Sequence, residues 1–417
     1  MKKKIKNILI SNIYSWKNKG DAAIVIAMLE DVQVQYPEAK ITLSSLDKND
    51  VSMYGDFEHR SSTPLHVYKG NESKITMLFK IVFFLFKVKL FGIIFKLGIS
   101  PYFLFSKLFS EKIKEYNKYD LVIGCGGGYL LTRSNGGIFQ LLVFAYDFYF
   151  AKIFNKPYIL YNQSIGPFKS KLHFSLMKPF LENAKKLIIR EEISFNRLKE
   201  YNLSNIILSS DIAFNLGIKN TSILDNHSFS ADNLNFGLTV RNWLPFDEQM
   251  IYEKEIATFI QVLLSQEQNA FFYFIPQVIV KDMSDDDLVT SNKIFELISK
   301  EYQSRVIVLD MNLGPKELKY IISQMNYFIG TRMHSNIFAL SSLIKTIAIA
   351  YEPKTTGIMK MLKLSSYVIN MEDVDSDKLY KLYLKLKSDK EYLKILSDRI
   401  NYVKIQSIND LQSFIEN

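Results

Sequence analysis

Cysteine is almost absent from this sequence, since Cys125 is the one thiol in 417 residues. One cysteine cannot form an internal disulfide or a cysteine-based metal site, and such low usage is typical of a reducing compartment. The five histidines are scattered along the chain, without the spacing of zinc ligands. We therefore expect no bound metal.

Long apolar runs are also missing. The basic N-terminus is followed by only a short apolar stretch at residues 8–10, far shorter than the hydrophobic region of a signal peptide. Runs such as residues 81–86 are much shorter than the roughly 20 residues that cross a bilayer. These absences predict a cytoplasmic protein and leave peripheral attachment to the inner face of the cell membrane open.

The charge balance is basic, with 52 Lys and Arg against 43 Asp and Glu, a net charge of +9. Basic charge favours an anionic partner such as nucleic acid, acidic lipid or a phosphorylated substrate. Nucleic acid is the least favoured of the three, because the lysines are spread out and no helix-turn-helix or basic aromatic platform is present.

Strand-like and helix-like segments alternate along the chain, which predicts an α/β protein with parallel sheets. The length of 417 residues suits two domains. A polar stretch at residues 221–233 separates two rounds of the pattern. We expect Rossmann-like domains at 1–220 and 221–395, followed by a helix at 396–417 that crosses back to the first domain.

An insertion at residues 75–116 interrupts the first domain. Its section 75–109 is rich in Phe, Leu and Ile and carries lysines that do not form one helical stripe. This spacing predicts two helices with a break near residues 87–89 or at Gly92. The composition favours contact with a membrane surface; the alternative is a helical hairpin packed on the domain, with lysine stems along its apolar surface.

Cationic side chains follow two consecutive strands near the end of the second domain. Arg332, His334 and Ser335 follow the predicted strand 326–330, and Lys354 follows the next strand. Loops at the carboxyl ends of parallel strands face the same crevice. The helix expected to begin at Asn336 adds free N–H groups and partial positive charge. The pattern predicts a site for a small, highly charged anion.

Other strand ends carry glycine, polar or charged residues. The glycines at 126–128 allow close approach of a ligand, but the sequence lacks the spacing and the later acidic residue of a dinucleotide site. We therefore expect no nicotinamide cofactor. The further candidates are Asp21, Gly126, Gly127, Gly128, Gln163, Gly166, Arg190, Asp211 and Arg241.

Together these loops resemble the polysaccharide pyruvyl transferase family. The matching pieces, in family order, are Asn18-Lys19-Gly20-Asp21, Gly126-Gly127-Gly128, Gln163-x-Ile165-Gly166-Pro167, Arg190-Glu191, Ser210-Asp211, and Arg332-x-His334 running into Tyr351-x-x-Lys354. The resemblance implies a GT-B-like fold, in which two Rossmann-like domains face a cleft. It also implies phosphoenolpyruvate as the donor and a pair of sugar hydroxyls as the acceptor, which together form a pyruvate ketal on a surface glycan.

The resemblance assigns the donor-binding or catalytic histidine to His334. Asp21 and Asp211 are then candidates for the general base, with Asp21 alternatively a helix cap. Phosphoenolpyruvate carries a phosphate and a carboxylate, so its site needs several cations. The candidates are Arg332, Arg190, Arg241 and Lys354, with Ser335 beside them, while Gly126, Gly127, Gly128, Gln163 and Gly166 line the cleft.

On this interpretation the first domain binds the acceptor, a glycan or lipid-linked oligosaccharide, and the second binds phosphoenolpyruvate. Phosphoenolpyruvate is a co-substrate, and no cofactor or metal is required. A nucleotide-sugar glycosyltransferase is the first alternative, with Glu352 available to bind a ribose. A non-catalytic scaffold docked on membrane through residues 75–109 is the second. The acceptor sugar and the oligomeric state stay open.

Overall fold

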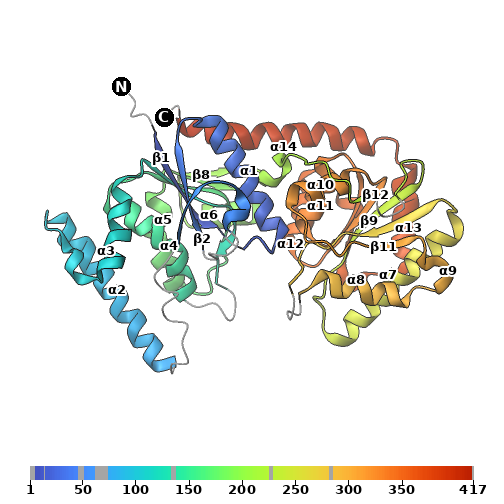
Figure 1. Cartoon of the computed structure of the whole chain (residues 1–417), viewed down its shortest axis with the longest axis horizontal. Coiled ribbons are helices and arrows are strands. Elements are labelled where there is room, and N and C mark those ends of the chain that lie inside the picture. The colour runs from blue at the N-terminus through green and yellow to red at the C-terminus, as the bar shows by residue number, and fades with distance from the viewer. Residues whose placement is uncertain are drawn as a thin grey trace. The chain divides into compact units, whose positions relative to one another are not determined.

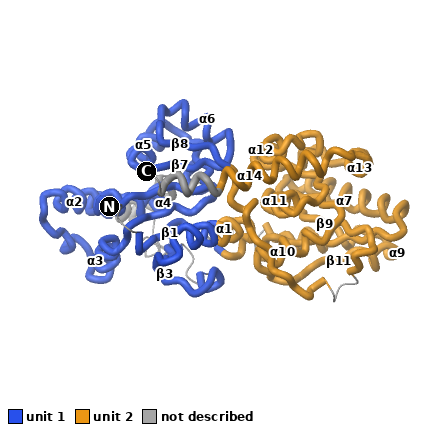
Figure 2. Tube along the Cα trace, turned by 90° about the horizontal axis from the view of Figure 1, so that it is seen from above, with its two compact units in different colours: residues 1–15, 28–209, 412–417 blue, residues 16–27, 210–411 orange. Residues whose placement is uncertain are grey.

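The structure, a computed structural model, describes residues 5–13, 15–45, 51–61, 74–132, 138–224, 229–280 and 285–415. The chain forms two compact units, each built around its own sheet (Figure 2). Unit 1 comprises residues 1–15, 28–209 and 412–417, and unit 2 comprises residues 16–27 and 210–411. Helices α1 (Lys19–Gln35) and α14 (Tyr392–Ile415) are each divided between the units.

The sheet of unit 1 is parallel, with strand order β3-β2-β1-β4-β6-β7-β8 and β5 beside β6. The order turns back between β1 and β4, which is where α/β sheets bind ligands beyond the carboxyl ends of their strands. Strands β1, β4, β6 and β7 are buried along nearly their whole lengths, as expected for a sheet covered on both faces. The edge strand β3, Glu-His-Arg-Ser, is polar. Their bounds are β1 Asn7–Ile13, β2 Lys40–Ser45, β3 Glu58–Ser61, β4 Leu121–Gly124, β5 Gly127–Leu130, β6 Tyr158–Ile165, β7 Lys186–Ile189 and β8 Ile206–Leu208.

Helices lie around this sheet, and two of them, α2 and α3, form the predicted insertion (Figure 1). They are α2 Lys74–Lys96, α3 Lys107–Lys114, α4 Ile138–Ile153, α5 Lys171–Asn183 and α6 Glu192–Glu200, with short 3₁₀ turns η1 Val51–Tyr54, η3 Pro101–Leu104 and η4 Glu115–Asn117. Phe91 and Phe109 of the insertion are buried in the core of unit 1. The insertion is therefore packed on the domain through its aromatic side chains.

The predicted break near residues 87–89 or at Gly92 is wrong, because α2 continues unbroken from Lys74 to Lys96. Gly92 serves packing instead. A Cβ at this position would lie 2.9 Å from the Tyr149 hydroxyl of α4, so the bare glycine lets the two helices approach closely. The helical chain stops just beyond Lys96, where Gly98 has a φ of +80°. Within the described residues no helix is both long and apolar enough to cross a membrane.

Unit 2 has a parallel sheet of order β11-β10-β9-β12-β13-β14. Its order turns back between β9 and β12. The strands are β9 Leu234–Thr239, β10 Ala270–Phe274, β11 Val306–Val308, β12 Tyr327–Gly330, β13 Lys345–Ala350 and β14 Val368–Asn370. The helices and turns are η5 Ile212–Asn215, α7 Phe246–Gln266, α8 Asp287–Leu297, α9 Lys300–Gln303, α10 Pro315–Ser323, α11 Met333–Ser341, α12 Pro353–Met361, η7 Ser365–Tyr367, η8 Met371–Asp373 and α13 Ser376–Ser388.

The prediction of an α/β protein with two Rossmann-like parallel sheets is confirmed. Helix α11 begins three residues earlier than predicted, at Met333, with Arg332 as its N-cap residue. His334 and Ser335 therefore lie in the first helical turn rather than in the preceding loop. This turn follows β12, next to the point where the order of the sheet turns back.

Candidate active site

The turn between β12 and α11 is fixed by Thr239 at the end of the neighbouring strand β9. Its hydroxyl accepts hydrogen bonds from the backbone N–H groups of Thr331 and Arg332, at 3.1 and 3.4 Å. Ser335 is fully buried, and its hydroxyl donates to the Arg332 carbonyl at 2.7 Å and lies 2.8 Å from the Thr239 hydroxyl. Ser335 thus holds the turn in place in this structure.

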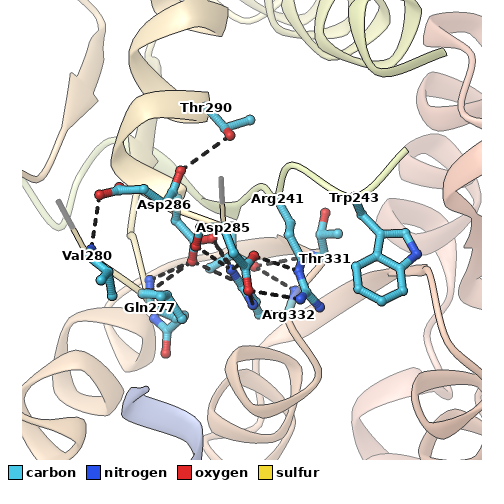
Figure 3. Close-up of polar contacts among 12 residues, drawn as sticks. Arg241, Trp243, Gln277, Val280, Asp285, Asp286, Thr290, Thr331 and Arg332 are labelled. Carbon is cyan, nitrogen blue, oxygen red and sulfur yellow. Dashed lines mark hydrogen bonds and ion pairs between the residues drawn. The ribbon is translucent and has the colours of Figure 1, made fainter. Parts of the chain in front are cut away.

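Arg332 is bound by two aspartates at the start of α8 (Figure 3). Its guanidinium donates to Asp287 Oδ1 at 2.5 Å and to Asp285 Oδ1 at 2.6 Å. Burial lowers the pKa of Arg332, but the two carboxylates outweigh this effect, so its pKa is raised above the ordinary value and the charge is retained. Neither aspartate was predicted from the sequence; three consecutive acids at 285–287 were the available signal.

The two aspartates differ in exposure. The Asp287 side chain is 1% exposed and also accepts hydrogen bonds from the backbone N–H groups of Gln277 and Val278. The Asp285 side chain is 41% exposed. Asp287 is therefore the buried carboxylate that pairs with Arg332, whereas Asp285 pairs with it from the solvent-exposed side.

Arg241 joins the same network through Asp285. Its Nε and one terminal nitrogen each donate to the Asp285 carboxylate at 2.9 Å. The guanidinium carbon also lies 4.4 Å from the ring centroids of both Trp243 and Tyr351, within the range of cation–π attraction. The two rings are also in contact, with centroids 5.0 Å apart, so Arg241 packs against a pair of aromatic rings at the carboxyl ends of β9 and β13. Lys354, also predicted, lies in the first turn of α12 after β13.

His334 lies against the first turn of α1. A Cβ on Gly20 would sit 2.1 Å from His334 Nδ1, so the imidazole occupies the space that any larger residue at position 20 would need. On its other side, Nε2 is 3.8 Å from Asp211 Oδ2. The Asp211 side chain is 3% exposed, and it caps η5 by accepting a hydrogen bond from the Ala213 N–H at 3.0 Å. Two predicted catalytic residues, His334 and Asp211, are thus adjacent.

The start of α1 contributes further groups to unit 2. Asn18 Oδ1 accepts hydrogen bonds from Gly20 and Asp21, so Asn18 is the cap and Asp21 is an acid of the first turn. Lys19, which was not predicted as a site residue, is 2% exposed, with its Nζ 5.2 Å from the Trp16 ring. Its backbone N–H donates to the Gln277 carbonyl.

The remaining predicted residues lie in unit 1, at the carboxyl ends of its strands. The side chain of Gln163 donates to the Cys125 carbonyl, and Arg190 Nε donates to the Ser164 hydroxyl at 2.9 Å. Glu191 caps α6 by accepting a hydrogen bond from Ser194. Gly126 precedes β5, and Gly127 and Gly128 begin it. Gly127 and Gly166 have φ values of +142° and +72°, which glycine adopts without strain.

The predicted residues thus form two sets. In unit 2 the structure brings Arg332, Arg241 and Ser335 into one hydrogen-bonded neighbourhood and pairs His334 with Asp211. The set in unit 1 comprises Gly126, Gly127, Gly128, Gln163, Gly166 and Arg190. Within the described part of the chain, no three His, Cys, Asp or Glu residues are grouped so as to hold a metal ion.

Known structures show the same class of fold. UDP-GlcNAc 2-epimerase from Neisseria meningitidis, bound to UDP-GlcNAc, has a TM-score of 0.60 at 12% identity, with 99% of this chain and 100% of that chain covered. A glycosyltransferase from Rickettsia africae has a TM-score of 0.55 at 11% identity, with 99% of each chain covered. At such low identity these likenesses establish the fold alone, and they confirm the predicted GT-B-like architecture.

Sequence comparison then gives the family. A sequence model of the polysaccharide pyruvyl transferase family matches residues 18–353. The amylovoran biosynthesis protein AmsJ of Erwinia amylovora is 21% identical over 393 residues, with 89% of each chain covered. The chain belongs to the polysaccharide pyruvyl transferase family and is a transferase of polysaccharide biosynthesis.

Proposed function

We propose that this protein transfers the pyruvyl group of phosphoenolpyruvate to two hydroxyls of one sugar in a glycan or lipid-linked oligosaccharide, forming a cyclic ketal. The adjacent pair His334 and Asp211, in the same unit as the arginine network, is the observation that carries this proposal. Family membership and the similarity to a protein named for amylovoran biosynthesis support a polysaccharide precursor as the acceptor.

The reaction needs a proton donor and a proton acceptor. A proton adds to the methylene carbon of phosphoenolpyruvate, and a sugar hydroxyl attacks the neighbouring carbon as it loses its own proton. A second hydroxyl then attacks this carbon, phosphate leaves with the electrons of its C–O bond, and the second hydroxyl proton leaves with the phosphate. The sum is one ketal and one phosphate from one donor and two hydroxyls.

In this proposal His334 moves the protons and Asp211 orients its imidazole. Their separation of 3.8 Å is longer than a hydrogen bond, but catalytic contacts are often loose before substrate binds. Asp21, in the first turn of α1 beside Gly20, is the second candidate base. The first turn of α11 adds N–H groups and partial positive charge for the donor phosphate.

The arginine network must change to bind an anion. Two arginines and two aspartates leave Arg241, Arg332, Asp285 and Asp287 with no net charge. Asp285 is 41% exposed and contacts both guanidinium groups, so its carboxylate occupies the position that a donor carboxylate or phosphate would take. We therefore assign Asp285 as the group that phosphoenolpyruvate displaces, while Asp287 keeps Arg332 in place.

Calorimetric titration of phosphoenolpyruvate, with UDP-GlcNAc as the comparison ligand, tests donor choice. Arg332→Lys keeps the charge but loses the fork that binds carboxylate and phosphate. Its affinity for phosphoenolpyruvate should fall about ten- to a hundredfold, the equivalent of roughly 1.5–3 kcal/mol. Arg305→Lys is the matched control. Arg305 donates to carbonyls at the end of α7 and immediately precedes β11, so it lies at the amino ends of the strands, whereas Arg332 lies at their carboxyl ends.

The outcomes of this titration separate the two functions. Saturable binding of phosphoenolpyruvate that weakens in Arg332→Lys and not in Arg305→Lys supports the proposal. Binding of UDP-GlcNAc without binding of phosphoenolpyruvate would overturn it in favour of a nucleotide-sugar glycosyltransferase.

A further inference from the structure

Unit 1 contains an apolar groove between α2 of the insertion and helices α4 and α5, separate from the strand-end residues described above. Its volume is about 560 Å³, within the range of pockets that hold small organic ligands. Aliphatic and aromatic side chains make up most of its walls. The walls include Leu85, Val88 and Ile93 of α2, Leu142 and Ala145 of α4, and Leu176 of α5.

Contacts of residues 84–92 position α2 against its neighbours. Toward the C-terminal end of α2, Gly92 lies against α4, where an added Cβ would be 2.9 Å from the Tyr149 hydroxyl. The same hydroxyl donates to the Val88 carbonyl at 3.0 Å. Phe84 and Phe91 on the neighbouring faces of α2 pack on Phe105. These contacts hold α2 against α4 and shape the groove in this structure.

Three lysines are the charged residues of the groove. Lys89 and Lys96 of α2 are exposed, and Lys152 of α4 is half-buried. No carboxylate is found among the described residues that line it. Lysine ammonium groups extend from apolar stems toward water, so an occupant with an apolar body and an anionic head would match both parts of the groove.

The lining favours a hydrocarbon chain over a peptide. A peptide brings N–H and C=O groups that need partners when buried, and the walls offer few polar atoms other than those of the lysines, Tyr149 and Ser175. In addition, the outward side of α2 exposes Phe79, Phe83 and Phe86. Exposed aromatic side chains beside basic residues are typical of surfaces that contact the interface of a membrane.

We propose that this groove binds the hydrocarbon chain of a lipid that carries a phosphate head group. The chain lies along α2, α4 and α5, and the phosphate contacts Lys89, Lys96 and Lys152. A phosphate-bearing lipid is the common chemistry of anionic membrane lipids and of lipid-linked glycan precursors. The proposal is independent of the donor chemistry in unit 2, so either can fail alone.

The direct test is titration of the full-length protein with monomeric n-alkyl phosphates of increasing chain length. Each methylene buried in the groove should strengthen binding about fourfold, until the groove is full. Ser175→Trp, which fills the groove from an exposed position on α5, should weaken binding at least tenfold. Ser175→Ala, which leaves the groove empty, should bind like the wild type.

The head-group contact has its own control. Lys89→Ala and Lys96→Ala should weaken binding of dodecyl phosphate and leave binding of dodecanol unchanged. Lys178→Ala, an exposed lysine of α5 that pairs with Glu182 and does not line the groove, should change neither. Thermal unfolding of each variant shows that unit 1 is still folded.

Three results would overturn the proposal. One is binding that does not depend on chain length, and another is equal binding of dodecanol and dodecyl phosphate to the wild type. The third is a protein that binds no alkyl phosphate but binds anionic phospholipid vesicles, with equal affinity in wild type and Ser175→Trp. The outward face of α2 would then contact the lipid, and the groove would have no part in binding.

Discussion

The contact between Gly20 and His334 is the sharpest residue-level feature of the site. A methyl group at position 20 would lie 2.1 Å from His334 Nδ1, so Gly20→Ala must displace the imidazole. We predict that kcat falls about a hundredfold or more, the usual effect of losing acid–base catalysis, and steady-state kinetics of phosphate release measures it.

A matched glycine in the same unit serves as the control. A methyl group on Gly357 in α12 would meet no other part of the structure within 4 Å, and alanine is favoured over glycine in helices by roughly 0.5–1 kcal/mol. Gly357→Ala should therefore keep full activity and raise the free energy of unfolding slightly. Equal activity of both variants would exclude His334 from the chemistry.

The two aspartates that bind Arg332 should respond differently to substitution. Asp287→Asn leaves the buried Arg332 without its enclosed carboxylate and should cost about 3–5 kcal/mol of unfolding free energy, measured by chemical unfolding.

Asp285→Asn removes a half-exposed pair worth at most about 1 kcal/mol. It should bind phosphoenolpyruvate up to about fivefold more tightly, since the donor no longer competes with a carboxylate. Weaker binding in Asp285→Asn would contradict the displacement.

These residues also show where sequence reasoning stops. Arg332 and His334 could be predicted as site residues because they follow a strand and match a family motif. The pairing of Arg332 with Asp287 could not, because the two are 45 positions apart and nothing local relates them. Contact between Gly20 and His334 is likewise a product of tertiary packing.

At the scale of elements, the start of α14 depends on Asp389. Its carboxylate accepts hydrogen bonds from the backbone N–H groups of Glu391 and Tyr392 at 2.9 and 3.0 Å, and from the Tyr367 hydroxyl at 2.5 Å. The hydrogen bond from Tyr367, more than burial, determines the pKa of Asp389 and lowers it below the ordinary value of 3.8.

The lowered pKa gives the sign of a pH effect. A carboxyl group whose pKa is lower in the folded state stabilises the protein above its unfolded pKa, and this stabilisation is lost as the pH falls through the folded value. Asp389→Ala should therefore be less stable than wild type by about 1 kcal/mol at neutral pH, and the difference should shrink below about pH 4. Chemical unfolding across this range measures it; a difference that grows in acid would refute the assignment.

The insertion illustrates how far elements could be predicted. Its composition predicts aromatic-rich helices, and this prediction is correct, but the predicted break near residues 87–89 or at Gly92 is wrong. The structure uses this glycine for close approach to α4. The spacing of apolar residues and the composition identify helices well. The role of a glycine within a helix, however, depends on the element that packs against it.

At the scale of the whole molecule, the fold followed from the alternation of strands and helices, and the two parallel sheets confirm it. The family match over residues 18–353 takes in residues of both units. Fold alone would have left several activities open, because epimerases and glycosyltransferases share it. The family assignment rests on the sequence match over residues 18–353 and not on the fold.

The most direct test of the account is incubation of the protein with ¹³C-labelled phosphoenolpyruvate and a panel of free and lipid-linked oligosaccharides. NMR follows the labelled carbon while released phosphate is measured in parallel. The account predicts conversion of the enol carbon to a ketal carbon, with one phosphate released per ketal, and loss of both signals in Gly20→Ala but not in Gly357→Ala. Unchanged phosphoenolpyruvate, with consumption of an added nucleotide sugar instead, would contradict it.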